Sequence, residues 1–175
     1  MKAIFPLFFF FFFSLIFWGC NTKQSPSSNK SAAIDSAKIV AQKVLAYSDS
    51  LDFKKAFQFY TNDSDGRFVE NGQLYASLQA VKDSYNQIAP TIQSLHNMVD
   101  NWNGVLALDD SSVLLTLPLH FTIQAKGLPE YKGQYVWSLV IQKRHEKWMV
   151  IQTHESWLNY AEAVAAITPP LKNSK

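Results

Sequence analysis

Hydrophobic positions recur every three or four residues in the stretch that follows residue 31. One side of this stretch is apolar, at Ala33, Ala37, Val40, Val44, Tyr47 and Leu51. The spacing predicts an amphipathic helix with one buried face. It also predicts a shorter helix over residues 53–60 and a third over residues 74–89. Pro90 ends the third helix, because proline lacks a backbone N–H and disfavours helical conformation in the residue before it.

The second half of the chain has the alternating pattern of an antiparallel meander. Long strands are predicted over residues 93–108, 113–124, 134–144 and 147–155, and a short one precedes the third helix at residues 67–70. The first long strand needs a bulge near residues 101–104, and Pro118 in the second must occupy a bulge or a position whose N–H is not needed. Helices first and strands afterwards predict an α+β domain.

A two-residue turn at His145-Glu146 sets a register for the last hairpin. In a regular pairing, Trp137 faces His154 and Tyr135 faces Ser156. Side chains alternate along each strand, so His154 and Glu155 point to opposite faces and cannot form an adjacent acid/base dyad. One face then carries Val136, Ser138, Val140, Met149, Ile151, Thr153 and Glu155, and the other carries Tyr135, Trp137, Lys143, Trp148, Gln152 and His154.

The first of these faces suits a pocket with an apolar floor and polar groups near its mouth. Glu155 there would bind an amine or a hydroxyl, or act as a general base if burial raised its pKa. The alternative is a carboxylate that is solvated or paired with a lysine. The pocket candidates are Glu155, Thr153 and Ser138 on the hairpin, with Tyr60 and Trp102 contributed from elsewhere.

The second face is rich in large amphipathic side chains of the kind that is enriched at protein interfaces. Its interface candidates are Trp137, His154, Tyr135 and Trp148. They predict a homodimer, and the alternative is packing beneath the C-terminal segment.

Charge and motifs exclude several other functions. The formal net charge is only +2 and no basic stripe is present, so we expect no nucleic-acid partner. His96, His120 and His154 lack the spacing of a metal site, and the Asp63–Asp65 run lacks the glutamate that completes a calcium loop. There is no phosphate loop, dinucleotide fingerprint or nucleophile elbow. We therefore expect no metal and no cofactor.

The N-terminal segment differs from the rest of the chain in being almost entirely apolar. Lys2 precedes an apolar run, residues 3–17, that includes six consecutive phenylalanines, which is typical of a secretory signal. The run closes in Phe17-Trp18-Gly19-Cys20, which resembles the lipobox of bacterial lipoproteins, where the cysteine is lipidated and the chain is cut before it. The resemblance implies a lipid anchor on Cys20. The alternative is an ordinary signal peptide and one free thiol.

The last hairpin carries a second resemblance. Residues 133–144 read GQYVWSLVIQKR and residues 147–156 read KWMVIQTHES: Lys-Trp after the turn, a β-branched run and a closing His-x-Ser. With the order of the elements, this resembles the nuclear transport factor 2-like superfamily and its SnoaL-like branch. The resemblance implies a cone-shaped α+β fold, in which three N-terminal helices pack in a strongly curved antiparallel sheet around an apolar pocket. It implies no single activity.

These inferences divide the chain into a signal peptide (1–19), a lipidated cysteine with a polar linker (20–31), a nuclear transport factor 2-like domain (32–158) and a C-terminal segment (159–175). We predict a lipoprotein of the bacterial cell envelope, in the outer membrane and facing the periplasm. Its domain would bind a small apolar or amphipathic ligand without catalysis. Two alternatives stay open: an isomerase or dehydratase that uses a pocket carboxylate, and a dimerising interaction protein of an envelope complex.

Overall fold

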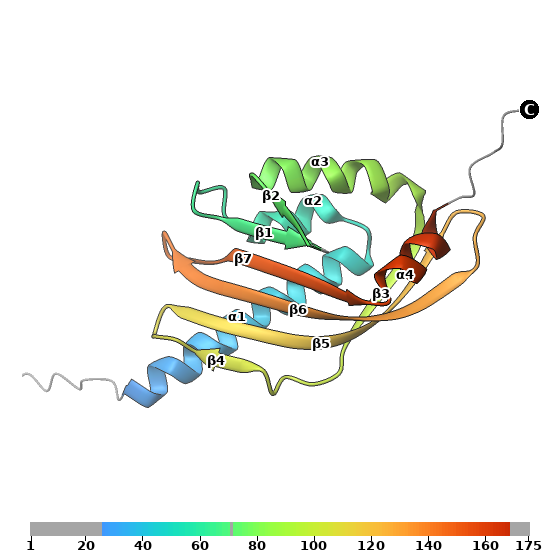
Figure 1. Ribbon diagram of the computed structural model, residues 1–175. Coiled ribbons are helices and arrows are strands. Elements are labelled where there is room, and N and C mark those ends of the chain that lie inside the picture. The colour runs from blue at the N-terminus through green and yellow to red at the C-terminus, as the bar shows by residue number, and fades with distance from the viewer. Residues whose placement is uncertain (1–25, 71, 169–175) are drawn as a thin grey trace, which may run out of the picture.

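The computed structural model describes residues 26–70 and 72–168, and the structural statements below refer to these residues. The predicted signal peptide, Cys20 and the first part of the predicted linker lie outside them. Figure 1 shows a long helix crossing one face of a curved sheet, a second helix beyond the short strands at one edge of the sheet, and a short C-terminal helix at the end of the long strands. The predicted α+β class and the cone-shaped fold are confirmed.

The helices follow the predicted periodicity but differ in their limits. α1 (Pro26–Asp49) begins inside the predicted linker, since proline is tolerated in the first turn of a helix. α2 (Phe53–Ala56) is a single turn, capped by the Asp52 carboxylate, and a 3-10 turn, η1 (Phe57–Phe59), follows it. α3 (Leu78–Ile88) starts later than predicted because the Ser77 side chain caps it, and it runs into η2 (Ala89–Thr91) at the predicted proline.

The sheet has the strand order β2-β1-β7-β6-β5-β3, with β4 also paired to β5. The strands are β1 (Arg67–Glu70), β2 (Gln73–Tyr75), β3 (Ile92–Val99), β4 (Val105–Ala107), β5 (Ser112–Ala125), β6 (Glu130–Arg144) and β7 (Lys147–Leu158). All pairs are antiparallel except β1 with β7, which are parallel. The prediction of a purely antiparallel sheet is therefore wrong at this edge, and the sheet is mixed.

The break between β3 and β4 lies within the predicted bulge. β3 pairs with the second half of β5 and β4 with its first half, and between them the Thr116 N–H donates to the Gly104 carbonyl at 2.7 Å. Pro118 lies beside this break, where its carbonyl accepts from the Asp100 N–H at 3.0 Å. The strand thus places proline where no ladder donor is required, as predicted.

The last hairpin has the predicted two-residue turn, and both turn residues have positive φ, 48° at His145 and 62° at Glu146. The register changes further along. Ile141 pairs with Val150, but Val140 pairs with Gln152, so Ile151 is an extra residue in β7. Beyond this bulge, each β7 residue lies on the opposite face from the β6 residue with which the predicted register pairs it.

The buried core lies between α1 and the inner face of the sheet. α1 contributes Ala33, Ala37, Val40, Ala41 and Val44, and β5 contributes alternate residues from Val113 to Ala125. α4 (Tyr160–Ile167) belongs to the predicted C-terminal segment and packs against β5 and β6 through Ala163. α3 and α4 both contribute residues to a cavity at this end of the core.

Candidate functional site

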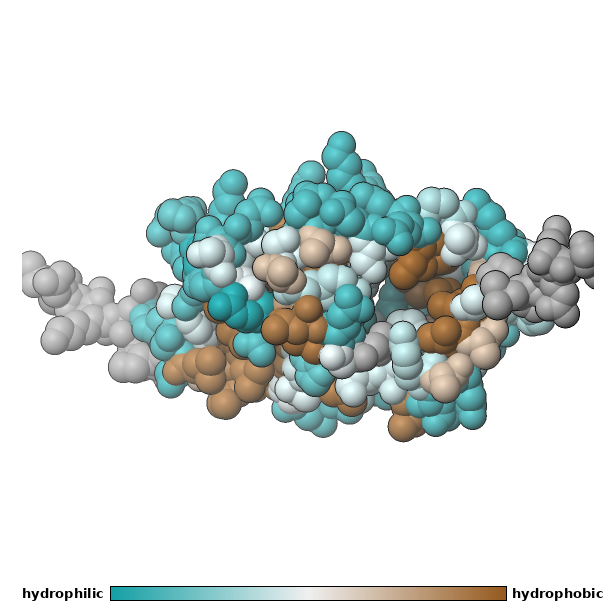
Figure 2. Space-filling model, turned by 45° about the horizontal axis from the view of Figure 1, so that its top comes forward, coloured by the Kyte–Doolittle hydropathy of each residue, from teal (hydrophilic) through white to brown (hydrophobic). Residues whose placement is uncertain are grey.

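A cavity of about 470 Å³ lies between the inner face of the sheet and the helices. Its lining includes Ile88 of α3, Thr91 of η2, and Val164 and Ile167 of α4, and the 45% exposure of Ile88 marks this side as the opening. Figure 2 shows a hollow flanked by hydrophobic residues on this side of the molecule. This volume is typical of sites for small organic ligands.

Aromatic side chains form two walls of the cavity. One wall comes from the helical segments and contains Phe53, Phe57, Tyr60 and Tyr85, whose adjacent ring centroids lie 5.0–5.4 Å apart. The other wall comes from the sheet and the start of α4 and contains Phe121, Tyr135, Trp157 and Tyr160, with adjacent centroids 4.8–6.4 Å apart. We call these the helix-side and sheet-side aromatic walls.

Two carboxylates, Glu70 and Glu155, also line the cavity. They are paired residues in the parallel ladder of β1 and β7. Laterally paired residues point to the same face of a sheet and their strands lie about 4.8 Å apart. The parallel pairing therefore brings two acidic side chains together on the inner face.

Both carboxyl groups are half-buried, and their pKa values are raised. Burial raises the pKa of Glu70 to about 8, with a contribution from the charge of Glu155 and a partial offset by the Tyr85 hydroxyl. Burial raises the pKa of Glu155 to about 7, partly offset by the indole of Trp157. The pair therefore holds a proton near neutral pH, because two neighbouring carboxylates do not both ionise readily.

Three tyrosine hydroxyls and one indole N–H of the lining lie near the acidic pair. The Tyr135 hydroxyl donates to Asn97 Oδ1 at 3.0 Å. Asn97 is held in place because its backbone N–H and its side-chain amide both donate to Asp49 Oδ1. Trp157 Nε1 is buried and makes no hydrogen bond of normal geometry within the described chain, although it lies close enough to Glu155 to favour the ionised form. Burial and the two carboxylates raise the pKa of both Tyr60 and Tyr85.

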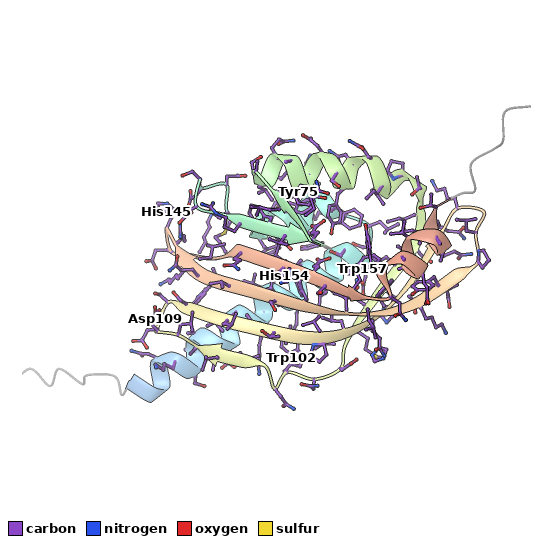
Figure 3. All side chains as sticks on the ribbon, in the orientation of Figure 1. Tyr75, Trp102, Asp109, His145, His154 and Trp157 are labelled. Atoms are coloured by element: carbon purple, nitrogen blue, oxygen red, sulfur yellow. The ribbon has the colours of Figure 1, made fainter. Side chains whose placement is uncertain are left out.

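The structure places only some of the predicted pocket residues in the cavity. Glu155 and Tyr60 line the cavity, but the other three do not. Thr153 lies behind the cavity wall, where it accepts a hydrogen bond of 2.8 Å from Trp137 Nε1. Ser138 is on the outer face, beside Thr116 at 3.4 Å. Trp102 lies between β3 and β4 under Lys38, whose Nζ is 5.9 Å from its ring (Figure 3).

The interface candidates also separate, because β6 turns Tyr135 and Trp137 toward the core while the bulge at Ile151 leaves His154 on the outer face. Trp137 and Tyr135 face the cavity and keep only 2% and 9% of their surface exposed, so the prediction that they lie on the outer face is wrong. Trp137 pairs with Glu155 instead of His154. His154 is exposed on β7 (Figure 3) and Trp148 is half-buried against the core. The homodimer stays a prediction.

Sequence reasoning missed Glu70 and Trp157. The sequence does indicate that Glu70 faces inward, because alternation along the short strand places Glu70 on the same face as Phe68. Phe68 is a large apolar residue and is 1% exposed. The pairing of this strand with β7 could not be predicted, because it joins residues far apart in the chain. Trp157 lies beyond the predicted end of the last strand, which extends to Leu158.

Other candidate chemistry is not supported in the described part of the chain. No group of three or more His, Cys, Asp or Glu residues there could hold a metal ion. Asp63 and Asp65 bind the Arg144 guanidinium at 3.0 Å and 2.7 Å. None of the described helices is both long and apolar enough to cross a membrane.

Comparison with known proteins agrees with this fold. A family model described as the SnoaL-like domain matches residues 38–160, so the chain belongs to the SnoaL-like domain family, within the nuclear transport factor 2-like fold. No curated protein sequence matches the chain.

Solved structures with the same fold share little sequence with it. A nuclear transport factor 2-like superfamily protein from Salmonella enterica has a TM-score of 0.63 at 12% identity, over 85% of this chain and 99% of its own. A hexachlorocyclohexane dehydrochlorinase from Novosphingobium barchaimii has a TM-score of 0.64 at 11% identity, over 75% and 90%. A ketosteroid isomerase-like protein from Erwinia carotovora has a TM-score of 0.61 at 13% identity, over 72% and 96%. At these identities the likeness shows the fold alone.

Proposed function

We propose that this domain binds a small amphipathic molecule in the cavity between its sheet and its helices. The observation that carries the proposal is the cavity itself, which has aromatic walls, an open mouth and polar groups confined to a few positions. Such a site accepts an apolar body and orients it through a few hydrogen bonds or charges. Glu70, Glu155 and the Tyr60 hydroxyl are the groups that would orient the ligand.

A proton-transfer enzyme of the isomerase or dehydratase type is the second candidate. It is favoured by the adjacent carboxyl groups, whose pKa values of about 8 and about 7 allow one to hold a proton while the other accepts one. The dehydrochlorinase and the ketosteroid isomerase-like protein show that the same fold is found in proteins named for such chemistry. Turnover that is lost in Glu155→Gln while ligand binding persists would favour this candidate over simple binding.

Narrowing the mouth tests the binding proposal. Val164 of α4 is half-buried and borders the cavity, so Val164→Trp should weaken the binding of any cavity ligand at least tenfold by occupying its space. The matched control is Ala165→Trp, which adds the same indole to an exposed position on the same helix. Ligands found by a thermal-shift screen of uncharged and charged aromatic compounds are then titrated into both variants. Equal affinity in the two variants would contradict the proposal.

We also propose that Cys20 attaches the domain to the envelope membrane. The support is the sequence alone, a signal-like segment that ends in Gly19-Cys20. In cells supplied with an alkyne-tagged fatty acid, the full chain should be labelled and Cys20→Ser should lose the label completely. The control is Ser25→Ala, which alters the same region and keeps the thiol. Label that persists in Cys20→Ser would contradict lipidation at this residue.

A further inference from the structure

The charged residues that line the cavity are all acidic. Two of its lining residues are acidic, Glu70 and Glu155, and none of the lining residues is Lys, Arg or His. No lysine, arginine or histidine within the described chain forms an ion pair with either carboxylate. Carboxylates withdrawn from water are normally paired, because an unpaired buried charge is costly. When the pair is ionised, at pH values above about 7 to 8, the cavity therefore offers negative charge that no basic side chain of the described residues neutralises.

The aromatic walls supply a second and independent feature. Ring faces attract cations through their quadrupole, and clusters of rings bind quaternary ammonium groups in particular. Tyr60 and Tyr85 of the helix-side wall lie close enough to Glu70 and Glu155 for both carboxylates to raise their hydroxyl pKa values. The rings and the acidic pair therefore act on the same part of the cavity.

Tyr60 also has unused hydrogen-bonding capacity. Its side chain is more than nine-tenths buried, at 7% exposure, and it lines the cavity. Its hydroxyl has no hydrogen-bond partner among residues 26–70 and 72–168. Trp157 Nε1 is the one fully buried polar side-chain atom without a partner in the described chain, so the Tyr60 hydroxyl opens into the cavity, where a ligand can reach both groups.

From these features we infer that the ligand is an organic cation, with an aromatic or aliphatic body between the two aromatic walls and an amine or quaternary ammonium head at Glu70 and Glu155. The inference rests on the proposed function and specifies the charge of the ligand. A carboxylate or phosphate ligand is excluded by the same charges, since it would be repelled from the acidic pair. A neutral ligand would leave both carboxylates unpaired.

Binding of a permanent cation should also displace protons. The titratable groups that face the acidic pair are Tyr60, Tyr85 and Tyr135, all neutral below pH 9 because their pKa values are raised. Proton uptake by the two carboxyl groups is then the only local competition. We expect affinity for a permanent cation to rise about tenfold or more between pH 6 and pH 9.

The test compares a cation with its uncharged isostere. Benzyltrimethylammonium and neopentylbenzene have the same shape and differ in one formal charge, and both are small enough for a cavity of about 470 Å³. Binding is followed by tryptophan fluorescence, since Trp137 and Trp157 line the cavity. At pH 8.5 the cation should bind at least tenfold more tightly than the isostere. The Glu70→Gln/Glu155→Gln variant should lose that advantage and bind the isostere as wild type does.

The control variant is Glu130→Gln/Glu146→Gln, which changes net charge equally at two exposed positions and should keep the preference. Equal binding of the two probes to wild type, or a preference that survives in the Glu70/Glu155 variant, would overturn the inference and leave the binding proposal standing. If neither probe binds, the inference is also overturned, and the Val164→Trp comparison with uncharged ligands decides the binding proposal separately.

Discussion

Replacing Trp137 by alanine should lower the free energy of unfolding by about 3–5 kcal/mol, the usual cost of truncating a large buried aromatic residue. Trp137 keeps 2% of its surface exposed and forms part of the cavity wall. Its Nε1–H donates to Thr153 Oγ1 at 2.8 Å, so the substitution also leaves a buried hydroxyl without its partner. Urea denaturation of the domain, followed by circular dichroism, measures the loss.

The neighbouring residue provides the matched control. Val136 is 43% exposed on the outer face of the same strand, and Val136→Ala should change the free energy of unfolding by less than about 1 kcal/mol. If β6 instead turned Val136 inward and Trp137 outward, as expected from the sequence, the order of the two effects would be reversed. Equal losses in the two variants would contradict the observed register.

The bulge also shows where local sequence stops being informative. The turn at His145-Glu146 and the first pairs of the hairpin could be predicted, because a two-residue loop fixes the register next to it. The extra residue could not, since Val150 and Ile151 are both β-branched and suit either face of a strand. Tyr135 and Trp137 lie on the buried face of β6 together with Ile141, and the extra isoleucine in β7 brings Glu155, instead of His154, onto that face. The face of β6 that the sequence predicts to be outer is therefore the buried one, and beyond the bulge Thr153 and Glu155 of β7 share it.

The acidic pair shows a second limit. Glu155 could be nominated from its place at the end of a strand that follows a run of apolar residues. Its partner, Glu70, lies on a short strand before α3, and the two meet through a parallel pairing. Local periodicity indicates that a strand exists and which residues share a face, but it does not indicate which distant strand lies beside it. The order of the elements, the fold and single lining residues such as Glu155 and Tyr60 could thus be predicted, while the pairing of Glu155 with Glu70 could not.

Stability of the ligand-free domain should fall as pH rises from about 5 to about 9. A carboxyl group with an ordinary pKa releases its proton near pH 4.5 in the unfolded chain, whereas Glu155 and Glu70 keep theirs until about pH 7 and about pH 8 in the folded domain. The unfolded state therefore binds fewer protons in this range, so stability is full below about pH 4.5 and is lost as pH rises through the folded pKa values. Both groups keep partial exposure, and we expect a loss of about 2–4 kcal/mol after allowing for solvent screening.

Urea denaturation at pH 5, 7 and 9 measures this loss, and the Glu70→Gln/Glu155→Gln variant should remove most of it, because an uncharged amide has no proton to release. The Glu130→Gln/Glu146→Gln variant should keep the wild-type slope, since its carboxylates are exposed. A flat profile in wild type, or the same slope in both variants, would contradict the raised pKa values. A bound cation should restore stability mainly at high pH, where the pair is ionised, since a ligand stabilises the state that binds it. The pH dependence of stability and the charge of the ligand are therefore two measurements of the same unpaired carboxylates.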